Sequence, residues 1–153
     1  MRTQLPKRKH ERGVMLIEAL LAILIFSIGI LAVVGMQGVA IKDVAAAKYR
    51  SDAGFLVNEL IATMWIDSVN VNSANYAYAG SGANPAKLAN WIAQVAVRLP
   101  GAAAWPPIVE VANDPSGGAE VTIQLRWQTP EEASKSLPEP HLYTVVASIH
   151  ANN

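Results

Sequence analysis

The chain has 153 residues, a length typical of one domain, and 52% of them are hydrophobic while only 16% are charged. This composition, with a formal net charge of +0, argues against an intrinsically disordered chain and against a dedicated nucleic-acid-binding protein, which needs a basic excess. The absence of cysteine excludes disulfides, thiolate metal ligands and a cysteine nucleophile.

The charge is unevenly distributed, because residues 1–13 carry a net charge of +4 and the remaining 140 residues carry −4. An uncharged apolar segment of 23 residues then runs from Ala19 to Ile41. As a helix it would be about 34 Å long, enough to cross a hydrocarbon core of roughly 30 Å. Since basic residues cluster before this segment, the positive-inside rule places the N-terminus in the cytoplasm and the bulk of the chain outside.

One acidic side chain, Glu18, lies at the start of this apolar segment. A carboxylate costs a few kcal/mol at the centre of a bilayer and less near its surface. Glu18 therefore either lies at headgroup depth or pairs with a cation inside an assembly, and both alternatives stay open. A cleaved secretory signal peptide fits less well, because its apolar region normally ends after about 7–15 residues.

The segment from Arg12 to Glu18, with the sequence RGVMLIE, resembles the N-terminal signature of type IV pilins and pseudopilins. Precursors in that family carry a basic leader that ends in Gly, then a hydrophobic residue, and a Glu at the fifth place of the mature chain. Val14 stands at the first place, where Phe is usual. The resemblance implies that a prepilin peptidase cuts between Gly13 and Val14 and N-methylates Val14. It also implies that Glu18 meets the Val14 amine of a neighbouring subunit.

The helix is predicted to continue past the membrane, from about Val14 to Ser68, because no proline occurs between Pro6 and Pro85. Such a helix would be about 80 Å long. Its outer half carries two apolar lines, one of which should pack on the chain's own domain. The second line either faces neighbouring subunits or is covered by the same domain. The first line comprises Ala53, Val57, Leu60 and Met64, and the second comprises Phe55, Ala62 and Ile66.

The rest of the chain is predicted to form a small mixed domain. A polar loop over residues 70–85 precedes a short helix over residues 86–99, with Leu88, Trp91, Ile92, Val95 and Leu99 inward. Strict alternation over residues 119–128 and a β-branched run over residues 141–149 predict two antiparallel strands, which a proline-rich loop joins. A weaker strand is expected over residues 108–112. The side chains expected on one face of the first strand are Val121, Ile123, Leu125 and Trp127.

The predicted fold class is thus α+β and pilin-like, with a long N-terminal helix packed on a small antiparallel sheet. Residues 1–13 would form a cytoplasmic prepilin leader, residues 14–41 a transmembrane and assembly helix, and residues 42–153 a periplasmic pilin-like domain. This last part includes the amphipathic half of the helix. Without the disulfide that most pilins have near the C-terminus, that region must be held by packing and hydrogen bonds alone.

No catalytic, cofactor-binding or metal site is predicted. The three histidines, His10, His141 and His150, lack partners at metal-ligand spacing, and neither a glycine-rich phosphate loop nor a Gly-x-Ser-x-Gly elbow is present. Turn chemistry explains Asp114. Of the four tryptophans, only Trp105, with the two prolines after it, is expected to be an exposed contact for a partner.

Within the family, the segment from Leu88 to Gly101 and the strand VTIQLRW are most similar to PilV-type minor pilins, the type IV pilus modification group. That resemblance implies a subunit that primes or modifies pilus assembly in a tip complex and supports adhesion and twitching motility. The implied partners are other minor pilins, the major pilin, the prepilin peptidase and the inner-membrane assembly platform, with no cofactor and no direct nucleic-acid binding.

The implied location is the inner membrane, as a single-pass protein with a cytoplasmic N-terminus and a periplasmic domain, and later the pilus or cell surface. Two alternatives stay open. One is a pseudopilin of type II secretion, which residues 84–128 would distinguish. The other is a periplasmic binding module on an uncleaved signal anchor.

Overall fold

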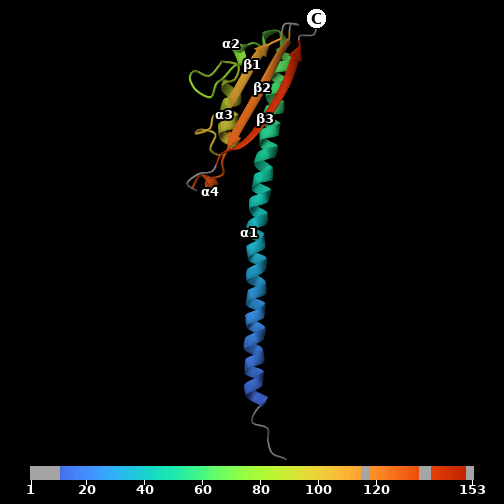
Figure 1. The fold of residues 1–153 in the computed structure, drawn as a ribbon, viewed down its shortest axis with the longest axis vertical. Helices are drawn as coiled ribbons and strands as arrows, with labels where there is room; N and C mark the ends of the chain where they lie inside the picture. The colour runs from blue at the N-terminus through green and yellow to red at the C-terminus, as the bar shows by residue number, and fades with distance from the viewer. Residues whose placement is uncertain (1–10, 115–117, 135–138, 151–153) are drawn as a thin grey trace, which may run out of the picture. The chain divides into compact units, whose positions relative to one another are not determined.

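The structure is a computed structural model that describes residues 11–114, 118–134 and 139–150. The chain forms two compact units, an N-terminal unit (Met1–Ala45) and a C-terminal unit (Ala46–Asn153). In chain order the elements are α1 (Glu11–Ile66), a 3-10 turn (Ser68–Asn70), α2 (Ser73–Tyr76), α3 (Ala89–Arg98), β1 (Ile108–Asn113), β2 (Gly118–Trp127), α4 (Pro130–Ala133) and β3 (His141–His150) (Figure 1).

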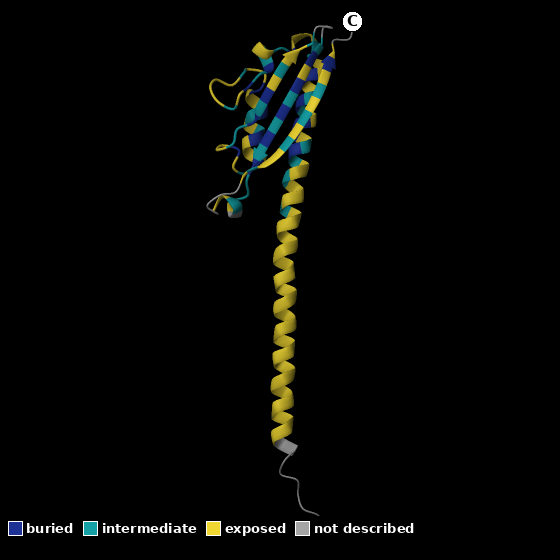
Figure 2. Ribbon diagram, viewed as in Figure 1, coloured by how far each residue is buried: buried dark blue, intermediate teal, exposed yellow. Residues whose placement is uncertain are grey.

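The fold is α+β, as predicted, with a long N-terminal helix packed against a three-stranded antiparallel sheet. The strands lie in the order β1-β2-β3. In the central strand, Ile123 pairs with Val109 of β1 and with Val145 of β3. Figure 2 shows the alternation of buried and half-buried residues along β2. This alternation confirms the predicted strand, whose buried side chains are Ala119, Val121, Ile123, Leu125 and Trp127.

The first apolar line of α1 faces the core, as predicted, while the second does not. Ala53, Val57, Leu60 and Met64 are at most 2% exposed. By contrast, the side chains of Phe55, Ala62 and Ile66 are exposed. The alternative in which the chain's own domain covers both lines is therefore wrong. The described part of the domain leaves the second line exposed.

Helix α3 packs on α1 through apolar side chains and one buried hydrogen bond. The indole nitrogen of Trp91 donates to the main-chain carbonyl of Leu56 over 2.8 Å. The predicted inward residues Leu88, Val95 and Leu99 are buried, and Ile92 is half-buried against the core. The helix begins at Ala89 rather than at residue 86, because the preceding residues form a turn in which the Leu88 amide donates to the Pro85 carbonyl.

The segment over residues 70–85 differs from the predicted polar loop. It contains α2 and buries Val71, Tyr76 and Tyr78. The amide and carbonyl of Tyr78 both bond to those of Val109, over 2.8 Å each, along the outer edge of β1. Aromatic side chains in a segment rich in Asn, Gly and Ser are thus part of the core.

Trp105 is less exposed than expected, and its contact with a partner stays a prediction. Trp105 and Pro106 are half-buried and Pro107 is buried. The Arg126 guanidinium lies 5.5 Å from the centre of the Trp105 ring and donates to the Pro106 carbonyl over 3.1 Å. These contacts hold the loop on the outer face of β2.

Asp67, directly after α1, joins three segments of the C-terminal unit. Its carboxylate accepts hydrogen bonds from the Asn70 amide over 2.6 Å and the Tyr76 hydroxyl over 2.7 Å, and it pairs with the Lys87 ammonium group. The bond from Lys87, followed by those from Asn70 and Tyr76, lowers the pKa of Asp67 to about 2. Burial, together with the bond to Asp67, raises the pKa of Tyr76.

The core position of Leu60 gives a first prediction. Leu60→Ala should lower the free energy of unfolding by about 2–5 kcal/mol, because it leaves a cavity between α1 and the sheet. Ile66→Ala on the same helix should change it by less than about 0.5 kcal/mol, because Ile66 is 88% exposed. Chemical denaturation of the detergent-solubilised full chain measures both values, and similar values for the two variants would contradict this packing.

The lowered pKa of Asp67 gives a second prediction. A carboxyl group whose pKa is lower in the folded chain stabilises it above the unfolded pKa and loses this effect as the pH falls through the folded value. The wild type should therefore be more stable than Asp67→Asn at neutral pH, and the difference should shrink between about pH 4 and pH 2. Denaturation midpoints across this range measure it, with Glu110→Gln, an exposed acid, as control. A constant difference down to pH 2 would contradict it.

Candidate assembly site on the N-terminal unit

The residues predicted for processing and assembly lie at the beginning of α1. The helix starts at Glu11, so the peptide bond between Gly13 and Val14 lies in its first turn, where main-chain amides have no acceptor within the helix. Val14 is 66% exposed, and Glu18 is exposed one turn further along. At this spacing of four residues the two side chains lie on the same side of the helix.

The N-terminal unit leaves its apolar side chains uncovered. Every residue from Gly13 to Val44 is exposed, and this part of α1 is yellow throughout in Figure 2. By length and composition, one helix of the described chain could cross a membrane, and it lies near the N-terminus. Soluble monomers rarely expose apolar patches larger than a few hundred Å², so this surface requires lipid or other protein to cover it.

Glu18 is the only charged residue between Gly13 and Ile41. A shallow apolar groove follows on the same helix and is lined by Phe26, Gly29, Ile30, Val33, Val34 and Gln37. Gly29, about three turns beyond Glu18, lies nearly in line with it, while the groove as a whole is centred about a quarter turn away around the helix.

The groove and the Glu18 carboxylate therefore adjoin only along the edge of the groove that holds Gly29. The structure places the three residues of the predicted site, Gly13, Val14 and Glu18, within one exposed stretch of helix. Cleavage and methylation themselves stay predictions. The basic residues of the predicted leader up to His10 lie outside the described part of the chain.

The C-terminal unit carries its own exposed apolar surface on α1. Phe55 is 54% exposed with the Arg98 guanidinium 4.9 Å from its ring centre, and Trp65 is 48% exposed. Phe55 belongs with Ala62 and Ile66 to the uncovered second line of α1, and Trp65 lies beside that line. This part of α1 therefore exposes an aromatic and aliphatic surface.

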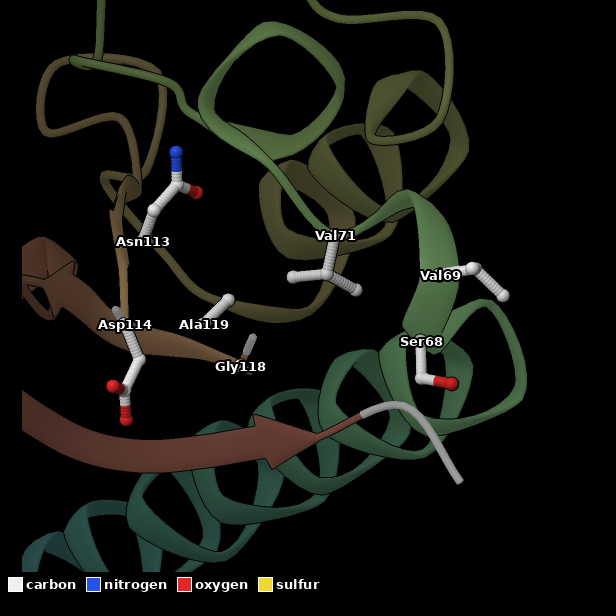
Figure 3. Close-up of a pocket in the computed structure, with 7 residues that line it drawn as sticks. All are labelled: Ser68, Val69, Val71, Asn113, Asp114, Gly118 and Ala119. Carbon is white, nitrogen blue, oxygen red and sulfur yellow. The ribbon is translucent and has the colours of Figure 1, made fainter. Parts of the chain in front are cut away.

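A separate small cavity of about 280 Å³ lies where the 3-10 turn approaches the β1–β2 hairpin (Figure 3). Its polar lining comes from Ser68, Asn113 and Asp114, and the rest is apolar or glycine. Among the described residues no group of three or more His, Cys, Asp or Glu side chains could hold a metal ion. The structure does pair each of the two described histidines with one carboxylate.

These pairs, His141 with Glu132 and His150 with Asp114, were not anticipated from the sequence. The partners of the second pair are 36 positions apart in the chain, and only the strand register brings them together. A histidine at each end of the predicted last strand was the one available signal.

No protein-family model matches the chain, and comparison with curated proteins and with solved structures finds no significant match.

The glycines of the N-terminal unit give a third prediction. A Cβ atom added at Gly29, Gly35 or Gly38 meets no atom of the described chain within 4 Å. Gly29→Ala should therefore leave helix content and membrane insertion unchanged, as judged by circular dichroism and membrane fractionation. Ala22→Gly, on the same side of the helix as Gly29, is the matched control, because it removes one methyl group where Gly29→Ala adds one. A loss of helix content in Gly29→Ala would contradict the open space found around Gly29.

Proposed function

We propose that this chain is a minor pilin of a type IV pilus that primes or modifies pilus assembly in a tip complex. One observation carries the proposal. Gly13, Val14 and Glu18 stand at prepilin spacing ahead of an uncharged, fully exposed helix, and that helix continues without a break into a domain built on a three-stranded sheet.

The chemistry of the site supports assembly through charge pairing. Cleavage after Gly13 would create a cationic amine at Val14, and methylation would keep its charge. Both this amine and the Glu18 carboxylate are costly alone among apolar helices, so a pair between neighbouring subunits recovers part of that cost. Because only one axial position of the neighbour forms the pair, it favours a single register of assembly.

The exposed surfaces are consistent with this role. The groove beside Gly29 offers a neighbouring helix an apolar surface, and Gly29 itself lies nearly in line with Glu18. Further out, Phe55 and Trp65 are left uncovered by their own domain. The proposed partners are other minor pilins and the major pilin, after the prepilin peptidase and the inner-membrane assembly platform have acted.

The proposed location follows from the charge distribution. The basic residues 1–13 stay in the cytoplasm, α1 crosses the inner membrane once, and the C-terminal unit lies in the periplasm. Extraction into the filament then carries the subunit to the pilus or cell surface. Adhesion and twitching motility would depend on it through the assembled pilus.

Mass spectrometry of the membrane-extracted protein tests the processing step. The proposal expects a mass that corresponds to residues 14–153 plus one methyl group. An intact Met1 would overturn it and favour a periplasmic binding module on an uncleaved anchor. Recovery of the processed chain with a secretion complex, and not with sheared pili, would favour the type II pseudopilin.

The carboxylate gives a fourth prediction. Glu18→Ala should insert into membranes normally but should be recovered in sheared pili at a level at least about tenfold lower, because the buried amine of a neighbour loses its partner. Glu18→Gln separates charge from size and should behave like Glu18→Ala. Ser27→Ala, a polar change in the same exposed segment but outside the groove, should remain near the wild-type level.

Immunoblots of sheared pili and membranes measure these levels. If Glu18→Ala reached pili at the wild-type level, the pairing step would be refuted, although processing at Gly13 would stand.

A further inference from the structure

The last strand of the sheet, β3, has one long side without a neighbouring strand. It pairs with β2 from His141 to His150 without a bulge, and no other described strand pairs with it. At the opposite edge of the sheet, Tyr78 bonds to Val109 of β1 and closes part of that edge. The two edges therefore differ, because the described part of the chain leaves β3 open along its length.

The register shows which main-chain groups of β3 face the open side. In an antiparallel ladder the amide and the carbonyl of a residue point to the same side, and this side alternates from one residue to the next. Both groups of Val109 bond to Tyr78 and hence point away from β2, so both groups of its partner Ile123 point to Val145 of β3. The residues of β3 whose amide and carbonyl groups face the open side are therefore Leu142, Thr144, Val146 and Ser148.

The sequence of β3 lacks the features by which natural edge strands avoid pairing with other chains. Such strands are short or bulged, or they carry Lys or Pro. By contrast, β3 is 10 residues long and contains no Lys, Arg, Asp, Glu or Pro. Its large apolar side chains Leu142 and Val146 are 60% and 58% exposed. A long, uncharged edge of this kind is a template for an added strand.

An exposed tryptophan of α1 lies on the side of the helix along which β3 runs. A Cβ atom added at Gly54 would lie 3.5 Å from the hydroxyl oxygen of Tyr143, and β3 also contacts the 3-10 turn that follows α1. Trp65 comes eleven residues after Gly54, which is three helical turns plus about 20°. Its side chain is 48% exposed. A strand added to β3 would therefore lie next to this indole.

We propose that the open edge of β3 binds an extended segment of a different protein, which runs antiparallel to β3 and becomes the fourth strand of the sheet. The bonding pattern defines the partner, because an extended main chain presents amides and carbonyls at the same spacing as the edge. The segment opposite Leu142 to Ser148 spans about seven residues. It carries neither charge nor proline, and its apolar side chains face Trp65.

A second copy of this chain fits the open edge less well than a different protein. Figure 1 shows β3 running in the same direction as the adjoining part of α1, so an antiparallel pair of two β3 strands would set the two α1 helices in opposite directions. Copies anchored in one membrane with the same end in the cytoplasm have parallel helices. Antiparallel pairing, which is the more stable kind, is then left to a strand of another protein. This step rests on the membrane anchoring in the proposed function.

Site-specific photo-crosslinking of the full chain in its own cells tests the proposal. The photo-reactive amino acid p-benzoylphenylalanine replaces one residue of the open edge at a time, at Leu142, Thr144, Val146 or Ser148. All four positions should give an adduct with the same protein, which is not a second copy. Peptide mapping should find the linked residues in one segment of that protein, two positions apart and in reverse order. No adduct, an adduct between two copies, or links scattered over several segments would each overturn the proposal.

A main-chain variant separates strand pairing from other contacts. Val146→Pro removes an amide hydrogen that faces the open side and leaves the bonds to β2 in place, since an edge strand accepts proline where the amide faces outward. With the photo-reactive amino acid at Thr144, the adduct should fall at least about fivefold, the change expected from one lost main-chain hydrogen bond. Val146→Thr is the matched control, because it keeps the amide and a similar shape, and its adduct should stay near the wild-type level.

A second variant keeps the test decisive if Val146→Pro loses its fold, as judged by circular dichroism. Val146→Lys adds a charge to the edge without changing the main chain and should lower the adduct in the same way. An unchanged adduct in the folded variants would overturn the proposal. The crosslinks require no cleavage after Gly13, so their failure leaves the proposed processing standing. An intact Met1 together with normal crosslinks would overturn the pilin proposal alone.

Discussion

An apolar helix surface that its own chain leaves uncovered is the constraint on which the molecule depends. From Gly13 to Val44 every side chain is exposed, and Glu18 is the only charge up to Ile41. Either lipid or the apolar helices of other proteins could cover such a surface. In both surroundings a carboxylate is tolerated only near a polar surface or beside a cation.

In the C-terminal unit, by contrast, one side of α1 is buried and the other is exposed. Leu56 and Leu60 face the sheet, and Trp91 fastens α3 to the helix through the Leu56 carbonyl. Beyond the end of α1, Asp67 connects the chain to α2 and to the segment before α3. The helix is thereby fixed on one side while Phe55 and Trp65 stay accessible on the other.

Patterns that repeat every few residues predicted the buried side of α1 and the central strand β2. The line through Ala53 and Leu60 and the alternation along β2 are repeats of neighbouring residues, and both are confirmed. The burial of Tyr76 and Tyr78 was missed, because it depends on Asp67 and on Val109, which the surrounding Asn, Gly and Ser residues do not indicate. In the candidate site, the RGVMLIE segment predicted Gly13, Val14 and Glu18, whose roles stay predictions, whereas the histidine pairs depend on a register between distant strands.

The two outer strands of the sheet differ in how they meet the surroundings. Along β1, Tyr78 closes part of the edge with two main-chain hydrogen bonds to Val109, while the described residues leave the far side of β3 without a paired strand. An unpaired strand edge exposes main-chain groups that can pair with another chain. Because Tyr78 covers part of the β1 edge, more of these groups are left open along β3 in the described sheet, so accidental pairing would be favoured there.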